Sequence, residues 1–543
     1  MVSSDAGNRR GLALALSGNG KASIPGGAAV NVETLSVVFA HGAPAAPSRP
    51  TGDFNAALTD LHLDQVIAAL VSKRPGYDIE HLFHEPARSV DEIKYRQEVA
   101  RDLQSPRLRP GIDEFATKLR SARALLGSAA KFENVLFEQG WTLDAAQAYC
   151  EAISALAVAL RDGDVMSEGL RSLRRYVDKY MLSEQFIYLS SGVSQLRGKL
   201  ADIEYTTHLR GGRVTVDRYR GQPNYTTQVE EVFAKFRQGD VKDYRARFKD
   251  LRDTNHVQGW VLEQLARLYP DQFAALASFC SRIGQFIDPT LARFDTEAQF
   301  YLCYLDMVAE LSRSGLGFCY PDVALSPPEV EVESGFDLAL ARLLANSGKP
   351  VVPNDVHLGP GERVIVVTGP NQAGKTTFAR MFGQLHYLAS LGLPVPGSSA
   401  RLQLADNVFT HFEREESFDD LHGKLEEELF RVQRVLAKAG PASVVVMNES
   451  FSSTSLADNR FIGAQVLQAL TNLGPLCVYV TFVDELSRLN EHVVSMVSEV
   501  TDGGPPATFR LRRRPADGRA YALALADRYG LTYSSLRHRL APA

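Results

Sequence analysis

The segment that most constrains this sequence is the glycine-rich octet Gly369-Pro-Asn-Gln-Ala-Gly-Lys-Thr376, which fits the P-loop pattern G-x-x-x-x-G-K-[ST]. A β-branched run ending at Thr368 precedes it, and apolar residues recur at helical spacing from Phe378 to Leu388 after it. The glycines let backbone N–H groups curl around phosphate oxygens, and the following helix directs its positive end at them. The sequence therefore predicts a nucleotide site.

Each residue type in the octet has a predicted role. Lys375 offsets charge on the β- and γ-phosphates, so we expect it to serve both binding and catalysis, and the Thr376 hydroxyl is expected to ligate Mg²⁺. The predicted cofactors are thus ATP and Mg²⁺. The phosphate-binding set is Gly369, Pro370, Asn371, Gln372, Ala373, Gly374, Lys375, Thr376 and Thr377.

A second strand, Ser443-Val-Val-Val-Met447, runs into Asn448 and Glu449. Apolar residues that end in an acidic pair form a Walker B site, where the first residue orients the metal shell and the second polarises water. Here the first residue is an asparagine, so one negative charge near the metal is missing. We expect Asn448 and Glu449 to complete the metal site with Thr376, and Glu449 to be the general base.

The composition limits the remaining classes. Lys and Arg number 59 against 64 Asp and Glu, which excludes a wholly basic coat protein for nucleic acid. No apolar run approaches the roughly 20 residues that span a bilayer, and the Leu-Ala run at residues 12–16 is short for a signal peptide. The five scattered cysteines form no Cys-x-x-Cys pair. We therefore expect reduced thiols, a cytoplasmic location and no membrane.

The texture of the chain changes along its length. Residues 1–50 contain 27 Ala, Gly, Ser or Pro, so we expect a disordered or weakly ordered extension in which only 35–39 could pair as a strand. Residues 51–325 are helical in pattern, with Leu170, Leu173, Val177 and Met181 on one face. From 326 to 543, apolar strands such as 443–447 and 476–481 alternate with helical stretches, which predicts an α/β domain.

One basic stretch interrupts the helical region. Alternating residues around Gly211-Gly212 suit a short hairpin, and residues 206–249 hold 10 Lys or Arg against 5 Asp or Glu. This local excess of positive charge fits either an ordinary solvated loop or a surface for nucleic-acid phosphates. The run Arg510-Leu-Arg-Arg-Arg514 leaves the same two interpretations open, and there the edge strand is favoured.

The motifs resemble those of the MutS family. The opening Thr368-Gly-Pro-Asn371 is distinctive among P-loop proteins, and Met447–Asp458, with Thr454-Ser455 and Asp458, resembles the family's Walker B and D-loop segment. Further similarities lie at 93–97, 304–311 and 517–526. The resemblance is strong over 326–543, moderate over 54–325 and absent over 1–50.

This resemblance implies a fold of the α/β plus all-α class. A C-terminal ABC-type P-loop ATPase domain, 326–543, would follow a MutS-like helical core and lever domain, 51–325, that carries the clamp-like insertion at about 206–249. It also implies a homodimer with composite ATP sites, DNA held through its phosphates, and an adenine pocket. The residues at the matching positions are Val351, Val352 and Asn354 for the adenine and Thr481 beside the γ-phosphate.

The departures from the family pattern are as informative. Phe482 stands where the family usually has a histidine, and Gly423-Lys424 replaces the serine that reaches the partner's ATP. Lys424 either contacts that γ-phosphate from the partner subunit or pairs with Glu428 on an exposed helix face. The length leaves no room for the family's mismatch-reading domain or a C-terminal Smr nuclease, and the Phe-x-Glu at 83–85 is read as chance.

We therefore expect a slow ATP hydrolase that couples its cycle to DNA, structured DNA more than mismatches, in repair or recombination. The alternatives are a nucleotide-gated scaffold with little turnover and an ATPase that acts on RNA or ribosomes. An SMC-like ATPase is disfavoured, because no Leu-Ser-Gly-Gly signature or long heptad run occurs.

Overall fold

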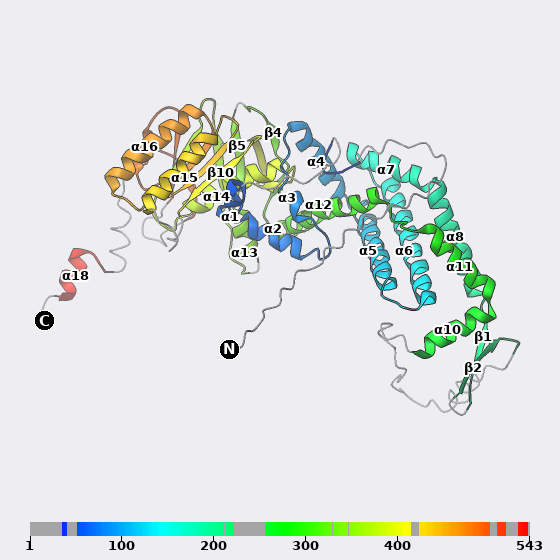
Figure 1. The fold of residues 1–543 in the computed structure, drawn as a ribbon. Coiled ribbons are helices and arrows are strands. Elements are labelled where there is room, and N and C mark those ends of the chain that lie inside the picture. Colours follow the sequence, from blue (N-terminus) through cyan, green and yellow to red (C-terminus); the bar gives the residue numbers. More distant parts are fainter. Residues whose placement is uncertain are drawn as a thin grey trace, which may run out of the picture.

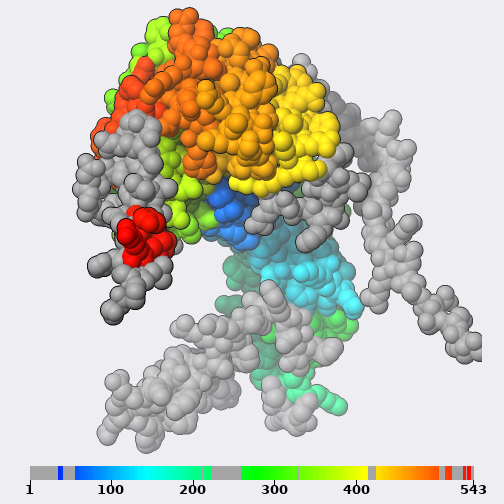
Figure 2. Space-filling view, turned by 90° about the vertical axis from the view of Figure 1, so that its left-hand side faces the viewer, coloured from blue at the N-terminus to red at the C-terminus, as the bar shows by residue number. Residues whose placement is uncertain are grey.

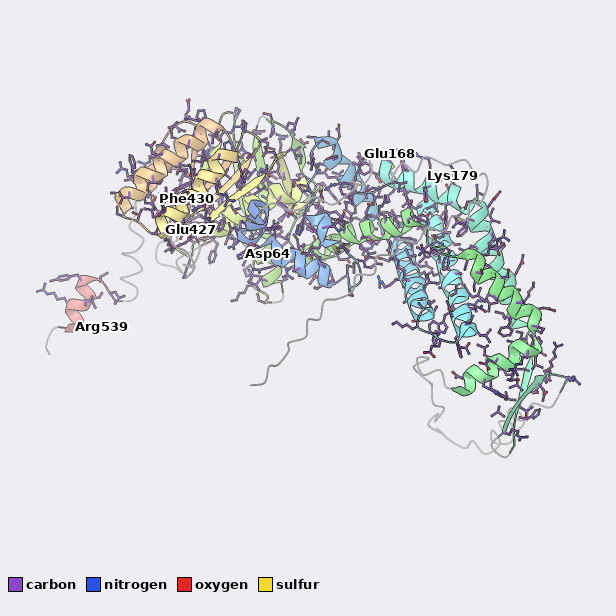
Figure 3. All side chains as sticks on the ribbon, viewed as in Figure 1. Asp64, Glu168, Lys179, Glu427, Phe430 and Arg539 are labelled. Atoms are coloured by element: carbon purple, nitrogen blue, oxygen red, sulfur yellow. The ribbon has the colours of Figure 1, made fainter. Side chains whose placement is uncertain are left out.

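The computed structural model describes residues 35–40, 52–210, 213–221, 256–327, 329–345, 347–413, 423–499, 508–516 and 530–540. These residues form an elongated molecule with a β-sheet region at one end and a β-hairpin at the other, joined by helices (Figure 1). Seen towards the sheet end, α15 and α16, in yellow and orange, cover much of the visible face (Figure 2). In the helical part, Glu168 and Lys179 lie along the outer side of α7 (Figure 3).

The helical region precedes the sheets in the chain. Its elements are α1 Gly52–Asp60, α2 Leu63–Ser72, α3 Glu80–Phe83, α4 Val90–Leu103, α5 Arg109–Ala129, α6 Val135–Asp162, α7 Glu168–Met181, α8 Glu184–Ala201, β1 Tyr205–Arg210, β2 Arg213–Arg218, α10 His256–Leu268, α11 Pro270–Ile283 and α12 Pro289–Arg313.

The sheet region follows. Its elements are β3 Phe318–Cys319, β4 Asp322–Ala324, β5 Val330–Gly335, α13 Leu338–Leu344, β6 Asn354–Leu358, β7 Val364–Thr368, α14 Lys375–Ser390, β8 Val395–Pro396, β9 Ser399–Gln403, β10 Val408–Phe412, α15 Lys424–Lys438, β11 Val444–Asn448, α16 Leu456–Leu473, β12 Leu476–Val480, the 3₁₀ helix η1 Asp484–Arg488, β13 Val493–Ser498, β14 Leu511–Arg513 and α18 Tyr533–Leu540.

Short polar side chains start many of the helices. Ser89, Ser167, Ser183 and Ser455 each accept a hydrogen bond from a backbone N–H in the first turn of α4, α7, α8 and α16. Asp288 does the same for α12. These N-caps satisfy donors that the helix itself leaves unpaired, so the sequence marks where the helices begin.

The main sheet has the strand order β10-β11-β12-β7-β13-β14, and all its pairings are parallel except that of β14 with β13. Every residue of β7, β11 and β12 is buried, as expected for strands covered on both faces. A second sheet has the order β4-β9-β5-β6. The three strands expected from the sequence at this sheet are confirmed.

Two expectations for the helical region are also confirmed. Helix α7 buries Leu170, Leu173 and Val177 on one face, and the fourth expected residue, Met181, is half-buried against the same core. The β1–β2 hairpin is antiparallel, with Tyr205 opposite Arg218. Residues 211–212 and 222–255 lie outside the described part, so most of the basic stretch at 206–249 is not tested, and neither is 517–526. All five cysteines are free thiols.

The structure differs from the sequence-based view at the start of the sheet region. Strands β3 and β4 begin before residue 326 and pair with β8 and β9, which lie far on in the chain. They escaped the sequence analysis because two- and three-residue strands are too short to show a period. The α/β region therefore starts near Phe318.

The segment 35–40 also differs from expectation. It forms no strand, yet Val37 and Val38 are fully buried against the helical region. Its partners are side chains of α4 and α12, as with the Tyr301 hydroxyl that donates to the Val37 carbonyl over 2.8 Å. This part of the expected weakly ordered extension is thus a fixed element of the core.

One helix, α6, is long and apolar enough to cross a membrane. Of its most apolar stretch, 61% is buried inside the protein, where Tyr149, Ile153 and Leu156 are fully covered. A mostly buried core helix meets the same criteria of length and composition. The packing of α6 against α5, α7 and α8 therefore accounts for its apolar residues.

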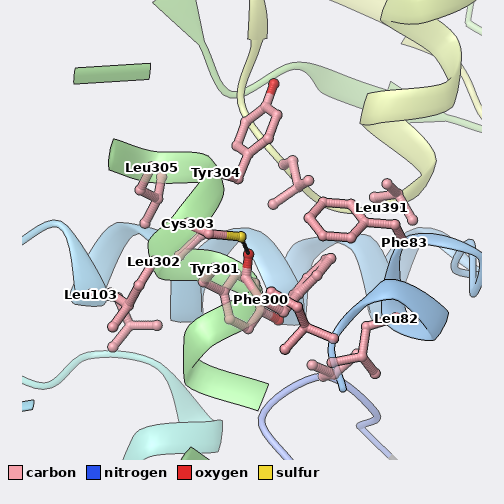
Figure 4. Close-up of a cluster of buried hydrophobic side chains, with 14 of the residues drawn as sticks. Leu82, Phe83, Leu103, Phe300, Tyr301, Leu302, Cys303, Tyr304, Leu305 and Leu391 are labelled. Carbon is pink, nitrogen blue, oxygen red and sulfur yellow. Dashed lines mark hydrogen bonds between the residues drawn. The ribbon is translucent and has the colours of Figure 1, made fainter. Parts of the chain in front are cut away.

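A continuous core joins the helical region to the sheet region. Phe83 from α3 meets Phe300 from α12 edge to face, with the ring centroids 4.8 Å apart, and Leu391 follows from the end of α14 (Figure 4). Tyr304 donates from α12 to the Pro394 carbonyl over 2.8 Å. We call this contact region between α3, α4, α12 and the chain after α14 the joint.

Gly392 allows the close approach at the joint. Its φ is +72°, and a Cβ placed there would lie 2.4 Å from Cβ of Arg96 on α4. We predict that Gly392→Ala lowers the free energy of unfolding by about 3 kcal/mol, because backbone strain and overpacking add. Chemical denaturation measures this.

The control is Gly76→Ala, where φ is also positive but nothing lies within 4 Å of the added Cβ. Backbone strain alone is expected to cost about 1 kcal/mol there. Equal losses in the free energy of unfolding of the two variants would contradict the steric role of Gly392 at the joint.

Candidate active site

The site forms where neighbouring parallel strands end. Asn448 on β11 pairs with Val480 on β12, which in turn pairs with Val367 on β7. The residues that follow these strands, Glu449, Thr481 and the P-loop, therefore emerge side by side at the carboxyl edge of the sheet. Ligands bind at this edge in open α/β sheets.

The backbone of the P-loop has the concave form that anions require. Gly369, Gln372 and Gly374 have φ values of +130°, +59° and +91°. Left-handed residues placed between right-handed ones turn successive backbone N–H groups towards one point. The N-terminus of α14 adds the positive end of its helix dipole at the same point. A Cβ at Gly369 would lie 2.8 Å from Ser498, so only glycine fits against β13.

Lys375 lies folded inside this loop. Its side chain is 3% exposed, and Nζ donates to the carbonyl oxygens of Gly369 over 3.0 Å and Pro370 over 2.9 Å. Burial lowers its pKa, whereas the Glu449 carboxylate acts in the opposite direction. The ammonium is thus poised where phosphate oxygens would offer stronger partners than carbonyls.

Glu449 faces the same ammonium. Oε1 lies 3.9 Å from Nζ of Lys375, and the backbone N–H of Glu449 donates to the Val480 carbonyl over 3.0 Å. Its φ of +52° is unusual for a residue with a side chain, which suggests that the conformation serves to aim the carboxylate. Burial raises the pKa of Glu449, and Lys375 partly opposes this.

Asn448 and Thr368 supply oxygens without partners. Both side chains are buried, and neither Oδ1 of Asn448 nor Oγ1 of Thr368 has a hydrogen-bond partner among the described residues. Such atoms fit a metal ion with its water shell. Thr376 is the second residue of α14 and Thr377 the third, and both are half-buried; the role of Thr376 as a Mg²⁺ ligand stays a prediction.

In the described part of the chain, no cluster of three or more His, Cys, Asp or Glu could hold a metal ion by itself. The predicted metal set of Thr376, Asn448 and Glu449 has only one carboxylate.

The ring of Phe482 lies next to the ammonium of Lys375, a contact that could not be predicted from the sequence. Its side chain is 47% exposed, and Nζ of Lys375 lies 4.6 Å from the ring centroid, within the range of a cation–π contact. The preceding Thr481 is buried, and its hydroxyl accepts a hydrogen bond from the Val483 N–H. An apolar ring, not an imidazole, therefore faces the P-loop ammonium.

Asn354 has structural partners in addition to its expected place near the adenine. Nδ2 donates to the Phe509 carbonyl over 3.0 Å, and Oδ1 accepts from the Leu511 N–H over 2.7 Å. That Phe509 carbonyl would lie 3.3 Å from a Cβ at Gly374. Asn354 thus ties residues 509–511 to the start of β6, and Phe509 in turn lies against Gly374 of the P-loop. Val351 and Val352 are half-buried just before Asn354.

Phe509 is a site residue that the sequence analysis missed. Its φ is +59° and its ring is 49% exposed beside the P-loop. An aromatic residue directly before the arginine-rich run was the available signal. Nothing local in the sequence indicated that it meets a loop more than 130 residues earlier.

Lys424 begins α15, as expected, but its ion pair differs from the predicted one. Nζ lies 2.7 Å from Oε1 of Glu413. Glu428 is not on an exposed face: it is 4% exposed and accepts a hydrogen bond from the Ser453 hydroxyl over 3.5 Å. The sequence misplaced Glu428 because charge alone suggested the solvent side.

The residues Thr454, Ser455 and Asp458 form a helix cap. The Ser455 hydroxyl donates to Asp458 over 2.7 Å and accepts from the Asp458 N–H over 3.2 Å. This reciprocal arrangement fixes the first turn of α16 directly after the Glu449 loop.

The fold and the site define a P-loop nucleotide-binding domain. Comparison with known proteins makes this more specific: residues 365–504 match the family model described as MutS domain V. The chain therefore contains a MutS-type domain V, which is the ATPase domain of MutS.

Individual relatives agree. The chain is 32% identical over 194 residues to DNA mismatch repair protein MutS of Granulibacter bethesdensis. The matched residues make up 36% of this chain and 21% of that protein. It is 31% identical over 206 residues to endonuclease MutS2 of Gemmatimonas aurantiaca, 36% and 25% of the two chains. A MutS of Prochlorococcus marinus matches at 26% over 359 residues, 62% and 37%. The matches thus span well under half the length of these relatives.

The double hydrogen bond of Asn354 gives a prediction. Asn354→Asp keeps the acceptor for Leu511 but places an oxygen against the Phe509 carbonyl. We expect faster amide hydrogen exchange at 508–513 and a loss of about 1 kcal/mol in stability.

His357→Ala on the exposed side of the same strand is the control, and it should leave exchange at 508–513 unchanged. Unaltered exchange in Asn354→Asp would show that residues 508–513 are held against β6 by other contacts.

Proposed function

We propose that this protein is an ATPase that couples ATP binding and hydrolysis to association with DNA, in repair or recombination. The observation that carries the proposal is the convergence of Lys375 and Glu449, 3.9 Å apart, at the carboxyl edge of a parallel sheet. The match to MutS domain V and the similarity to a DNA mismatch repair protein MutS and an endonuclease MutS2 support it.

In this mechanism the P-loop N–H groups and Lys375 bind the phosphates, and Lys375 leaves its carbonyl partners to do so. Mg²⁺, held through Thr376 and Asn448, would neutralise developing phosphate charge. Glu449 accepts a proton from the attacking water, and its positive φ keeps the carboxylate aimed at that point. Val351, Val352 and Phe509 would flank the adenine ring of the nucleotide.

Slow turnover is part of the proposal. Asn448 lacks the charge of a carboxylate, and Phe482 cannot donate a hydrogen bond to a phosphate oxygen. The same two residues favour the alternative of a nucleotide-gated scaffold, which binds ATP with negligible hydrolysis.

We also propose a homodimer with composite ATP sites. Large apolar side chains are exposed on α15 and α16: Leu429 is 40% exposed, Phe430 50%, Leu456 71% and Phe461 67%. Figure 3 labels Phe430 beside Glu427 on α15. An apolar surface of this kind supports a protein partner. Lys424, at the start of the same helix, would exchange Glu413 for the partner's γ-phosphate.

DNA is proposed to bind at the hairpin end, far from the nucleotide (Figure 1). Arg213, Arg218 and Arg220 are exposed on or beside β2. Contacts from arginine to phosphates follow the path of the backbone and carry no base sequence, so they give no means of reading a mispair, and we propose that structured DNA is preferred. A cytoplasmic location accords with this role.

The ATPase is tested by Glu449→Gln. We expect nucleotide binding to persist and steady-state hydrolysis to fall by about 10²- to 10³-fold, because the general base is lost. In the wild type, the raised pKa of Glu449 shifts the acid limb of the pH–rate profile to higher pH, because the carboxylate accepts a proton only when it is ionised.

Lys375→Ala is the companion variant and should lose nucleotide binding itself. Equal hydrolysis rates in the wild type and Glu449→Gln would favour the scaffold instead.

The polymer is tested by competition binding among duplex, mismatched and branched DNA and structured RNA, with and without ATP. We expect branched DNA to compete best and affinity to fall steeply with salt. Tighter RNA binding would favour the RNA or ribosome alternative, and no binding at low salt would overturn the assignment of the hairpin.

A further inference from the structure

The segment 35–40 contacts the rest of the protein as a bound peptide would. It belongs to no strand, and its most buried residues, Ser36, Val37 and Val38, are 4%, 0% and 0% exposed. Leu35 and Phe39 pack against the same core at its two sides. Helices α4 and α12 supply the surface on which it lies. We call residues 35–40 the clasp.

Side chains satisfy the backbone of the clasp on the α12 side. Glu297 accepts from the Ser36 hydroxyl over 2.8 Å through Oε1 and from the Val37 N–H over 2.7 Å through Oε2. Tyr301, one turn further on, donates to the Val37 carbonyl over 2.8 Å. Glu297 and Tyr301 are 3% and 0% exposed, so these bonds lie in the core.

Helix α4 supplies the other half. Tyr95 donates to the Ser36 carbonyl over 2.6 Å, and Nε of Arg96 donates to the Val38 carbonyl over 2.9 Å. The Arg96 guanidinium also lies 5.5 Å from the centroid of the Phe39 ring. Within the clasp, the Ser36 hydroxyl oxygen accepts from the N–H groups of Val38 and Phe39.

These contacts define a selective site. It requires an apolar peptide with a hydroxyl at its second position, because no other group there both donates to Glu297 and accepts two N–H bonds. Two tyrosines and one guanidinium read three successive carbonyls. The helices satisfy the three carbonyls and the Val37 N–H, and the Ser36 hydroxyl satisfies the N–H groups of Val38 and Phe39.

The site is connected to the joint. Arg96 donates through Nη1 to the Glu85 carbonyl over 2.8 Å, and its Cβ fills the space that Gly392 leaves open. The clasp, the turn after α3 and the turn after α14 therefore meet on one buried arginine. Occupancy of the site holds α4 against α12 where the sheet region begins.

We propose that α4 and α12 form a peptide-binding site whose ligand is the clasp, held in place by non-covalent contacts that do not require its covalent link to α1. The clasp thereby acts as a separable ligand that locks the two helices at the joint.

The test uses the full chain with a specific protease site placed between residues 42 and 50. After cleavage, we expect the N-terminal fragment to stay bound at one per molecule through gel filtration and in native mass spectrometry. Its dissociation rate is then measured on addition of excess synthetic peptide Leu35–Ala40.

Two tyrosines of α12 provide a matched comparison (Figure 4). Tyr301→Phe removes the bond to the clasp, and Tyr304→Phe removes an equally buried bond to Pro394 instead. We expect Tyr301→Phe and Ser36→Ala each to speed dissociation about tenfold, as loss of one or more buried hydrogen bonds does. Tyr304→Phe should leave the rate unchanged.

Loss of the fragment immediately after cleavage, or equal rates in the two tyrosine variants, would overturn the proposal. If the cleaved protein unfolds, the uncut variants decide: Tyr301→Phe must lower hydrogen-exchange protection at 36–39 more than Tyr304→Phe does. Equal protection in these variants also overturns it.

Discussion

The buried helix α14 is the element on which the rest of the structure depends. It begins with the P-loop lysine and ends at the joint, and from Phe378 onwards almost all of its residues are buried. Its polar residue Gln384 is fully covered yet satisfied: Nε2 donates to the Leu61 and Asp337 oxygens over 2.9 and 2.8 Å, and Oε1 accepts from the Leu338 N–H. Arg380 adds an ion pair with the same aspartate at 2.8 Å. A helix held this way moves only as a unit, because any slip would leave buried polar groups unpaired.

Both ends of α14 therefore communicate. At the far end, the Ser390 carbonyl accepts from the Ala87 N–H over 2.7 Å, and the Tyr387 hydroxyl donates to the Phe83 carbonyl. Phe83 is the last residue of α3 and Ala87 lies four residues after it, so the far end of α14 is bound to the end of α3 and the turn that follows. A displacement of the first turn of α14 would therefore reach the end of α3 and the turn after it through one rigid helix.

Much of this could be predicted from the sequence. The P-loop, its strand and helix, β11 with Asn448 and Glu449, and α7 are each encoded by residues close together in the chain. The glycine-rich pattern, β-branched runs and apolar residues at helical spacing were sufficient for them. That Lys375 and Glu449 lie at one edge of the sheet follows from the strand order of the structure.

The rest depends on contacts between distant residues. Ser36 meets Glu297 across 261 positions, so a short apolar run was read as a strand in an otherwise weakly ordered extension. Asn354 and Phe509 meet across 155 positions, and the buried state of Glu428 depends on the loop after β11. No periodicity records such pairs, because their register is set by tertiary packing.

The length of α12 has a mechanical consequence. Its 25 residues span about 37 Å, and Tyr304 anchors it about three-fifths of the way from Pro289 to Arg313. From that pivot to Pro289 the helix extends about 22 Å, so a tilt of about 5° displaces the distal end by about 2 Å. The hairpin lies farther out still (Figure 1), and it would be displaced in proportion if α8, α10 and α11 moved with α12. A rotation too small to break a hydrogen bond at the pivot would thus move the arginines of β2 by a distance comparable to the spacing between neighbouring phosphate oxygens.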